Sequence, residues 1–145
     1  MAKIRIKRLR EGAVIPTYGT AFSAGADLYA CLEEVVTIAP GQTLKVPTGF
    51  ALELPTGTAG LVFARSSLGT KKGLAPANKV GVIDSDYRGE VLVVLHNHSQ
   101  ETQQIAPGER VAQLLIVPVF TPGFVEAEEL SGTQRGAGGF GSTGK

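Results

Sequence analysis

The chain has 145 residues, of which 43% are hydrophobic and 19% charged, and its formal net charge is +1. Such a chain forms one globular domain with its own core, which excludes disordered and fibrous classes. The near-zero charge gives no overall reason to expect a nucleic-acid partner, and no apolar run approaches the ~18 residues of a membrane span. The single cysteine, Cys31, excludes an internal disulfide, so we expect a cytoplasmic protein.

Short strands separated by glycine and proline are predicted along the chain. Residues 3–9 alternate basic and apolar side chains, which indicates a half-buried strand with a cationic solvated face; a nucleic-acid arm is the less favoured alternative. The other apolar runs predict a short strand within 23–30, a strand over 35–38, a strand pair over 42–54 broken at 47–49, and strands over 60–64, 80–83, 91–95 and 110–117.

Helical periodicity is nearly absent, and Ser66 or Ser67 could cap one short helix after the strand over 60–64. The pattern predicts an all-β fold, a jelly-roll-like distorted barrel with at most one short helix. Residues 131–145 contain six glycines and cannot pack a core of their own. We therefore predict a barrel domain over 1–130 and a glycine-rich C-terminal arm over 131–145.

The stretch from Asn78 to Glu90 carries the strongest chemical signal. Apolar runs on both sides of a group of turn residues predict a β-hairpin. Asp84 directly follows the last apolar residue of the first strand. A carboxylate held there by a rigid strand, and partly buried, suits a general base.

Other chemistry-bearing residues have ordinary structural explanations. His96 and His98 lie two apart without a third ligand, which is a weak metal signal. Cys31 has no adjacent basic group, which favours a buried inert thiol. The glycine-rich arm matches parts of the dinucleotide-binding and phosphate-loop motifs. Both motifs require a strand before them and a helix after them, and neither is predicted here. Its backbone N–H groups could still wrap phosphates.

Five segments, taken in order, resemble the motifs of the trimeric dUTPases: residues 24–30, 65–67, 81–90, 108–113 and 135–144. The third and fifth are long and specific, whereas Ser67 and Ala137 depart from residues common in the family. The resemblance implies a dUTPase-like barrel, a homotrimer with shared active sites, and hydrolysis of dUTP to dUMP and pyrophosphate with Mg²⁺. It also implies a role in keeping uracil out of DNA and supplying dUMP for dTMP synthesis.

The resemblance implies roles for individual residues. Asp84 would deprotonate the water that attacks the α-phosphorus, and Asp27 would orient the water shell of a Mg²⁺ ion that has no direct protein ligand. The base and sugar would be bound by Asn78, Gly81, Val82, Ile83, Tyr87 and Phe140. The phosphates would be bound by Arg65, Ser66, Ser67, Gln113, Arg135, Gly139, Ser142 and Thr143. The hairpin geometry adds Leu92, which we expect opposite Val82 in the same pocket.

Main-chain groups of an open hairpin can pair with uracil, whereas cytosine would leave polar groups unpaired at a cost of ~1–3 kcal/mol each. The Tyr87 ring would leave no room for a ribose 2′-OH, and the arm would close over a neighbouring subunit's site as a lid. Two alternatives stay open. One is a dCTP deaminase or a bifunctional dCTP deaminase/dUTPase of the same architecture, and the other is a non-enzymatic β-barrel binding module.

Overall fold

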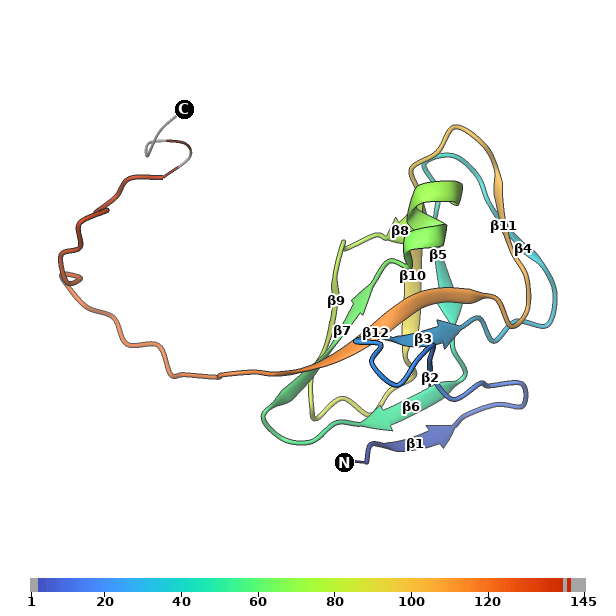
Figure 1. The fold of residues 1–145 in the computed structure, drawn as a ribbon, viewed down its shortest axis with the longest axis horizontal. Coiled ribbons are helices and arrows are strands. Elements are labelled where there is room, and N and C mark those ends of the chain that lie inside the picture. Colours follow the sequence, from blue (N-terminus) through green and yellow to red (C-terminus); the bar gives the residue numbers. More distant parts are fainter. Residues whose placement is uncertain (1–2, 140, 142–145) are drawn as a thin grey trace.

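Residues 3–139 and residue 141 are described by the computed structural model of the protein (Figure 1). The strands are β1 (Arg5–Arg8), β2 (Thr17–Tyr18), β3 (Ala26–Tyr29), β4 (Val36–Ile38), β5 (Thr43–Pro47), β6 (Phe50–Glu53), β7 (Thr58–Phe63), β8 (Leu74–Pro76), β9 (Gly81–Ile83), β10 (Leu92–Asn97), β11 (Gln103–Ile105) and β12 (Arg110–Pro118). A short π-type helix, η1 (Leu68–Lys72), separates β7 from β8. Over the described part of the chain, the predicted all-β jelly-roll-like barrel with at most one short helix is confirmed.

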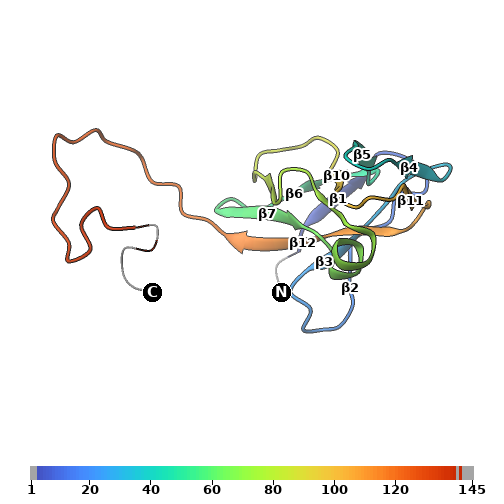
Figure 2. The same cartoon turned by 90° about the horizontal axis from the view of Figure 1, so that it is seen from above.

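The longest strand, β12, lies at the centre of the largest sheet. That sheet has the order β2-β3-β12-β7-β9, and Figure 2 shows β12 beside β7. The other described strands pair as β5-β10-β8, β1-β6 and β11-β4, all antiparallel. Ala112 and Leu114 are two apart on β12 and are both buried, as side-chain alternation along a half-buried strand requires.

The core lies between the sheets and is apolar. Its largest fully buried apolar side chains are Phe50, Leu28, Ile38, Leu74, Leu95 and Ile105. Each stabilises the fold by ~1.5–3 kcal/mol relative to an exposed side chain. Two polar side chains are buried with them, and both have partners. Thr48 Oγ1 donates to the Val91 carbonyl at 2.6 Å, and Asn97 Nδ2 donates to the Ile38 carbonyl at 2.8 Å.

The hairpin predicted around Asp84 is wrong, because β9 and β10 do not pair with each other. In β9, Val82 lies opposite Leu61 of β7, whereas β10 pairs with β5 and β8. Leu92 therefore lies opposite Pro47 and not opposite Val82. The two strands diverge after the loop that joins them.

Glu90 explains why the chain leaves β9 after the loop. One carboxylate oxygen of Glu90 accepts a hydrogen bond from the Gly49 N–H at 2.8 Å, and the other accepts from Arg10 at 2.7 Å. The next residue, Val91, donates its N–H to the Phe50 carbonyl at 2.9 Å. These bonds tie the end of the loop to the opposite side of the barrel and direct β10 toward β5.

Two smaller expectations also need correction. β5 and β6 follow each other over 42–54 but do not pair, because the turn at Gly49, with φ of 75°, sends the chain from one sheet to another. Ser67 occupies the N-cap position of η1 but makes no side-chain cap bond, since its hydroxyl accepts from Arg65 instead. Cys31 is buried, as predicted.

Beyond β12 the chain leaves the barrel as a long extended segment (Figure 1). The Val119 N–H donates to the Gly57 carbonyl at 2.9 Å. The apolar residues that follow, Phe120, Phe124, Val125 and Leu130, are each at least 90% exposed. Among the described residues, no helix is long and apolar enough to cross a membrane.

Candidate active site

A cavity of about 240 Å³ opens where β9 and β10 diverge. Seven residues predicted from the sequence line it: Asn78, Gly81, Val82, Ile83, Asp84, Tyr87 and Leu92. Leu92 reaches the cavity although its expected pairing with Val82 is wrong, because both strands border the gap. Phe140, also predicted for this pocket, lies outside the described residues.

The cavity walls offer strand edges to an incoming molecule. β9 is the last strand of its sheet, so its outer main-chain groups have no strand partner in the described part of the chain. β8 pairs with β10 from Leu95 to Asn97, and the Ala77 N–H donates to the Val94 carbonyl, which leaves the Leu92 end of β10 without a strand partner on that side. A planar group with alternating donors and acceptors can therefore bind between the two edges as an added strand would.

A tight turn carries Asn78 to the cavity. The Lys79 N–H donates to the Pro76 carbonyl at 2.9 Å, and Lys79 has φ of 68°, a left-handed conformation uncommon outside glycine. Gly81 packs closely against Val62 of β7 and lies beside the amide. A Cβ at Gly81 would lie 3.7 Å from Asn78 Nδ2 and 3.2 Å from Val62 Cβ.

Asp84 lies at the end of β9, on the rim of the cavity. Its carbonyl accepts the Tyr87 N–H at 3.1 Å, so the turn fixes its backbone. The side chain is exposed in the single chain, which contradicts the expected partial burial. In the described structure no donor occupies the carboxylate, so it is available to accept a proton from a water in the cavity.

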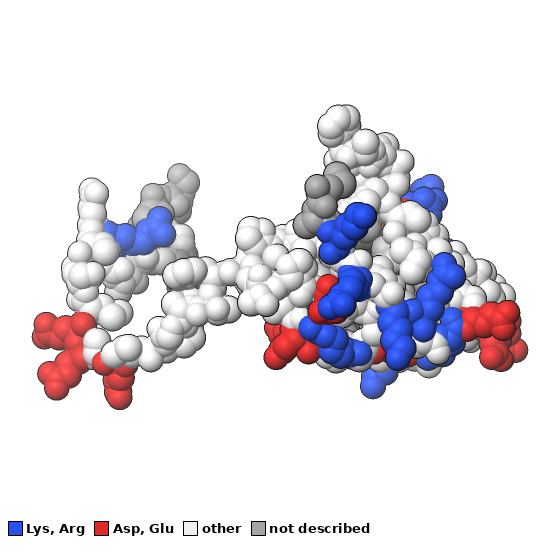
Figure 3. Space-filling view, turned by 90° about the horizontal axis from the view of Figure 1, so that it is seen from below, with Lys and Arg blue, Asp and Glu red and all other residues white. Residues whose placement is uncertain are grey.

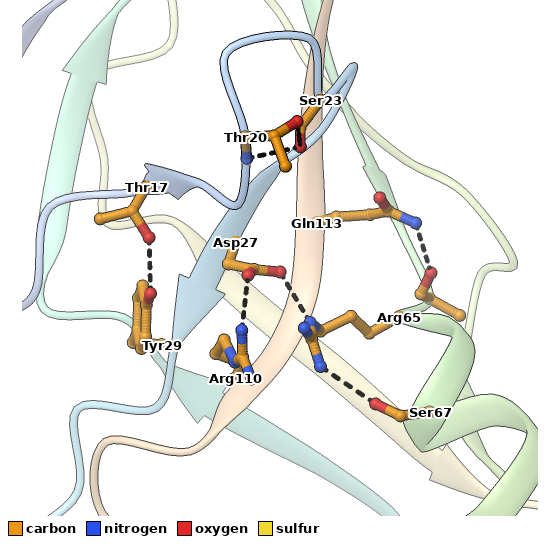
Figure 4. Close-up of polar contacts among 10 residues, drawn as sticks. Thr17, Thr20, Ser23, Asp27, Tyr29, Arg65, Ser67, Arg110 and Gln113 are labelled. Atoms are coloured by element: carbon orange, nitrogen blue, oxygen red, sulfur yellow. Dashed lines mark hydrogen bonds and ion pairs between the residues drawn. The ribbon is translucent and has the colours of Figure 1, made fainter.

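A second group of predicted residues surrounds Asp27 (Figure 4). Asp27 accepts a hydrogen bond from Arg65 Nε at 2.7 Å, and Arg65 Nη1 donates to Ser67 Oγ at 3.0 Å. Gln113 Nε2 donates to the Ala64 carbonyl at 3.0 Å. A cationic guanidinium, hydroxyls and an amide at one place are the donors that suit phosphate oxygens.

The register of β12 explains why these residues meet. Gln113 lies opposite Asp27 of β3 on one side and opposite Phe63 of β7 on the other. Arg65 follows two residues after Phe63, so three separate segments converge at one position of β12. Gly25 makes room for the amide, because a Cβ there would lie 2.6 Å from Gln113 Oε1.

Arg110, which was not predicted from the sequence, donates to the second carboxylate oxygen of Asp27 at 3.3 Å. A β-bulge between Arg110 and Ala112 puts Arg110 opposite Tyr29, on the same face as Asp27. A regular strand would have pointed Arg110 to the other face, since successive side chains alternate. The segment over 108–113 contains Arg110, so the sequence could have indicated it. Only the bulge in β12, however, determines on which face of the sheet the Arg110 side chain lies.

The remaining predicted positions that the structure describes neither line the cavity nor hydrogen-bond to Asp27. Ser66 is exposed at the start of the helical turn, and its carbonyl accepts a hydrogen bond from Thr70 Oγ1 at 2.7 Å. Arg135 and Gly139 are exposed on the extended segment that runs away from the barrel (Figure 1). Ser142 and Thr143 lie outside the described residues. In one chain, therefore, the cavity, the group around Asp27 and the arm are separate.

The histidines lie outside the cavity. The His96 and His98 rings meet edge-on with centroids 4.5 Å apart, and His96 Nδ1 is 2.8 Å from Thr43 Oγ1. Desolvation, together with the positive charges of Lys79 and His96, lowers the pKa of His98 below its usual value. Within residues 3–139 and 141, no three His, Cys, Asp or Glu side chains are grouped closely enough to hold a metal ion.

Comparisons with known proteins agree over nearly the whole chain. The dUTPase family model matches residues 11–144. A deoxyuridine 5'-triphosphate nucleotidohydrolase from Desulfitobacterium hafniense (strain DSM 10664 / DCB-2) is 51% identical over 143 residues, 98% of this chain and 95% of the relative. The structure of Staphylococcus bacteriophage 80alpha dUTPase with dUPNHPP has a TM-score of 0.91 at 28% identity and covers 100% of both chains. A mutant dUTPase from phage phi11 of S. aureus, described with a structural Mg(II) ion, has a TM-score of 0.82 at 25% identity and covers 90% of this chain and 100% of its own.

Proposed function

The chain belongs to the dUTPase family, and we propose that it hydrolyses dUTP to dUMP and pyrophosphate with Asp84 as the general base. The observation that carries the mechanism is the cavity between β9 and β10, with unpaired strand edges on its walls and an uncommitted carboxylate on its rim. The reaction would supply dUMP for dTMP synthesis and keep uracil out of DNA, and we place it in the cytoplasm.

Uracil binds between the strand edges. It offers an acceptor at O4, a donor at N3 and an acceptor at O2, which main-chain groups can pair as a neighbouring strand would. The Asn78 side chain reaches the same cavity and helps to fix the base. Cytosine reverses the pattern at positions 4 and 3, so it leaves groups unpaired at ~1–3 kcal/mol each.

Asp84 activates the attacking water. The water oxygen forms a bond to the α-phosphorus, its proton passes to the Asp84 carboxylate, and the bond from the α-phosphorus to the bridging oxygen breaks. Pyrophosphate then leaves with the electron pair of that bond. General base catalysis of this kind contributes ~10²–10⁴ in rate. The nucleophile is water, so no serine or cysteine nucleophile is needed.

The group around Asp27 binds the phosphates. Arg65 retains Nη2, which has no partner among the described residues, and Ser66, Ser67 and Gln113 add hydroxyl and amide groups. None of these residues lines the cavity, and the arm that carries Arg135 and Gly139 extends away from it. These separations support a homotrimer in which neighbouring subunits complete each site.

The residues present fit a Mg²⁺ ion held through water. Each oxygen of the Asp27 carboxylate has two lone pairs, and its contacts with Arg65 and Arg110 use one on each. The remaining lone pairs can accept hydrogen bonds from metal-bound water, which Mg²⁺ characteristically retains. Bound by the triphosphate, the ion would offset phosphate charge, while Asp27 would orient its water shell.

The extended segment has the composition of a docking strand. Its exposed apolar side chains, Phe120, Phe124 and Val125, are followed by the acids Glu126 and Glu128. On the barrel, an apolar groove of about 180 Å³ includes Ile4, Ile6, Pro16, Tyr18, Leu114 and Ile116. Arg5, Lys7 and Arg8 of β1 are exposed cations. Figure 3 shows Lys and Arg side chains gathered on the lower face of the barrel, with some acids beside them, and a group of acids on the arm. We propose that the segment of one subunit docks on this groove of its neighbour.

Replacing both Phe120 and Phe124 with Asp is expected to weaken the trimer by at least tenfold in dissociation constant. Both side chains are at least 90% exposed in the single chain, so the change costs the isolated barrel little. In the trimer it would bury two carboxylates in an apolar groove. Sedimentation equilibrium measures the association, and Phe22→Asp, which alters a 98% exposed loop residue, is the matched control. Unchanged association of the double variant would contradict the docking.

Pyrophosphate release with dUTP, dCTP, dTTP and UTP, measured side by side, tests the proposed function. We expect kcat/KM for dUTP to exceed that for dCTP by at least 100-fold, because cytosine leaves polar groups unpaired. We expect a factor of ~100 over UTP, because the Tyr87 ring excludes the 2′-OH, whereas dTTP pairs as dUTP does and differs only by one methyl group. Ammonia release from dCTP would instead assign the protein as a dCTP deaminase. Release of neither product would favour a binding module.

A further inference from the structure

Gly89 lies against the hydroxyl end of the Tyr87 ring. A Cβ on Gly89 would lie 2.5 Å from Tyr87 Cζ and 2.9 Å from Cε2, and it would overlap the hydroxyl oxygen. Contacts this short do not occur between real atoms, so any side chain at position 89 must displace the ring. The hydroxyl end of the ring therefore lies directly against the backbone of Gly89.

The backbone conformation does not require glycine here. The left-handed glycines of the described chain include Gly49 and Gly108, but the φ of Gly89 lies outside that region. Alanine can adopt such a conformation without the strain that it meets at a positive φ. What glycine provides at position 89 is space for the Tyr87 ring.

A hydrogen bond holds this same hydroxyl end of the ring. Its hydroxyl donates to the Glu90 carbonyl at 3.0 Å, and the Glu90 side chain is anchored by the Gly49 N–H at 2.8 Å and by Arg10 at 2.7 Å. The acceptor therefore belongs to the rigid part of the barrel. Tyr87 itself lines the cavity, so these contacts set the position of one cavity wall.

We propose that Gly89 is a positioning residue for sugar specificity: it lets the Tyr87 ring lie against the backbone, where the ring excludes a ribose 2′-OH. This inference rests on the proposed function, in which Tyr87 lies against the deoxyribose. A Cβ at position 89 pushes the ring off its support and breaks its bond to Glu90. The Tyr87 ring is then no longer held at a fixed distance from the sugar.

The size of the effect has a physical limit. A pocket that excludes one added hydroxyl by shape alone discriminates by ~100-fold. Gly89→Ala displaces the ring but does not remove it, so we expect the ratio of kcat/KM for dUTP to that for UTP to fall by about tenfold. Tyr87→Ala removes the wall and is expected to lower the ratio by ~100-fold.

The test compares Gly89→Ala, Tyr87→Ala and the double variant, using pyrophosphate release from dUTP and UTP. If Gly89 acts only through the ring, the double variant has the ratio of Tyr87→Ala alone, because residues in contact are not additive. Gly19→Ala is the control, since its Cβ would make an ordinary contact of 3.6 Å with Ser23 Oγ. A wild-type ratio in Gly89→Ala, or fully additive losses, would overturn the proposal.

Melting temperatures test the proposal even if Gly89→Ala folds poorly. The overlap at position 89 disappears when the ring is removed, so any loss of melting temperature in Gly89→Ala should be recovered in the double variant relative to Tyr87→Ala. A loss that persists in the double variant would show a backbone role for Gly89 and refute the inference. Failure of the wild-type protein to release pyrophosphate from dUTP would refute the proposed function instead.

Discussion

Replacing Asp84 with Asn is expected to lower kcat for dUTP hydrolysis by at least 100-fold while the Kd for a non-hydrolysable dUTP analogue changes little. The amide has nearly the same size but cannot take the proton of the attacking water. A general base contributes ~10²–10⁴ in rate, so this loss is the size of its whole contribution. Single-turnover pyrophosphate release measures the chemical step directly.

The structure makes this variant a clean test. The Asp84 side chain is exposed and accepts no hydrogen bond within the described residues, so the substitution should not lower the melting temperature. Asp86→Asn is the matched control, because Asp86 is an exposed carboxylate in the same loop that does not line the cavity. Near-normal turnover of Asp84→Asn would remove Asp84 from the role of base.

Truncation after Gly132 is expected to leave the trimer intact and to lower turnover by about two decades or more. The docking segment over 119–130 remains, whereas Arg135, Gly139 and Phe140 are lost. A stacked aromatic is worth ~1–3 kcal/mol, and hydrogen bonds to charged phosphate add ~1.5–3 kcal/mol. Together they amount to ~2.5–6 kcal/mol, which is about two to four decades at ~1.4 kcal/mol per decade. Steady-state kinetics and sedimentation on the same sample test both halves of this prediction.

Arg135→Ala in the full-length chain distinguishes the effect of the Arg135 charge on turnover from the effect of closing the arm over the site. It removes one phosphate contact but keeps the rest of the arm, so we expect its turnover to lie between that of the wild-type protein and that of the truncated protein. A truncated protein with full activity would show that the arm takes no part in catalysis. A truncated protein that dissociates would show that residues 133–145 belong to the assembly contacts instead.

Sequence reasoning succeeded where the signal is local. Alternating apolar residues mark strands, and glycine with proline marks turns, because backbone sterics and side-chain alternation act over a few residues. The cavity residues could be named for the same reason, since Asp84 and Tyr87 lie in one short segment. The side-chain cap bond expected at Ser67 does not form, because the Ser67 hydroxyl accepts a hydrogen bond from the Arg65 guanidinium instead.

The sequence by itself therefore determined an all-β chain, the family through its five segments, and the residues for which we propose a role in the chemistry. Only the tertiary structure decided which strands pair. Glu90, held by Gly49 and Arg10, separates β10 from β9, and without that separation there is no cavity for a base. The bulge in β12 likewise points Arg110 at Asp27. Strand pairing and face selection depend on hydrogen bonds and burial between residues tens of positions apart, which the pattern of neighbouring residues does not contain.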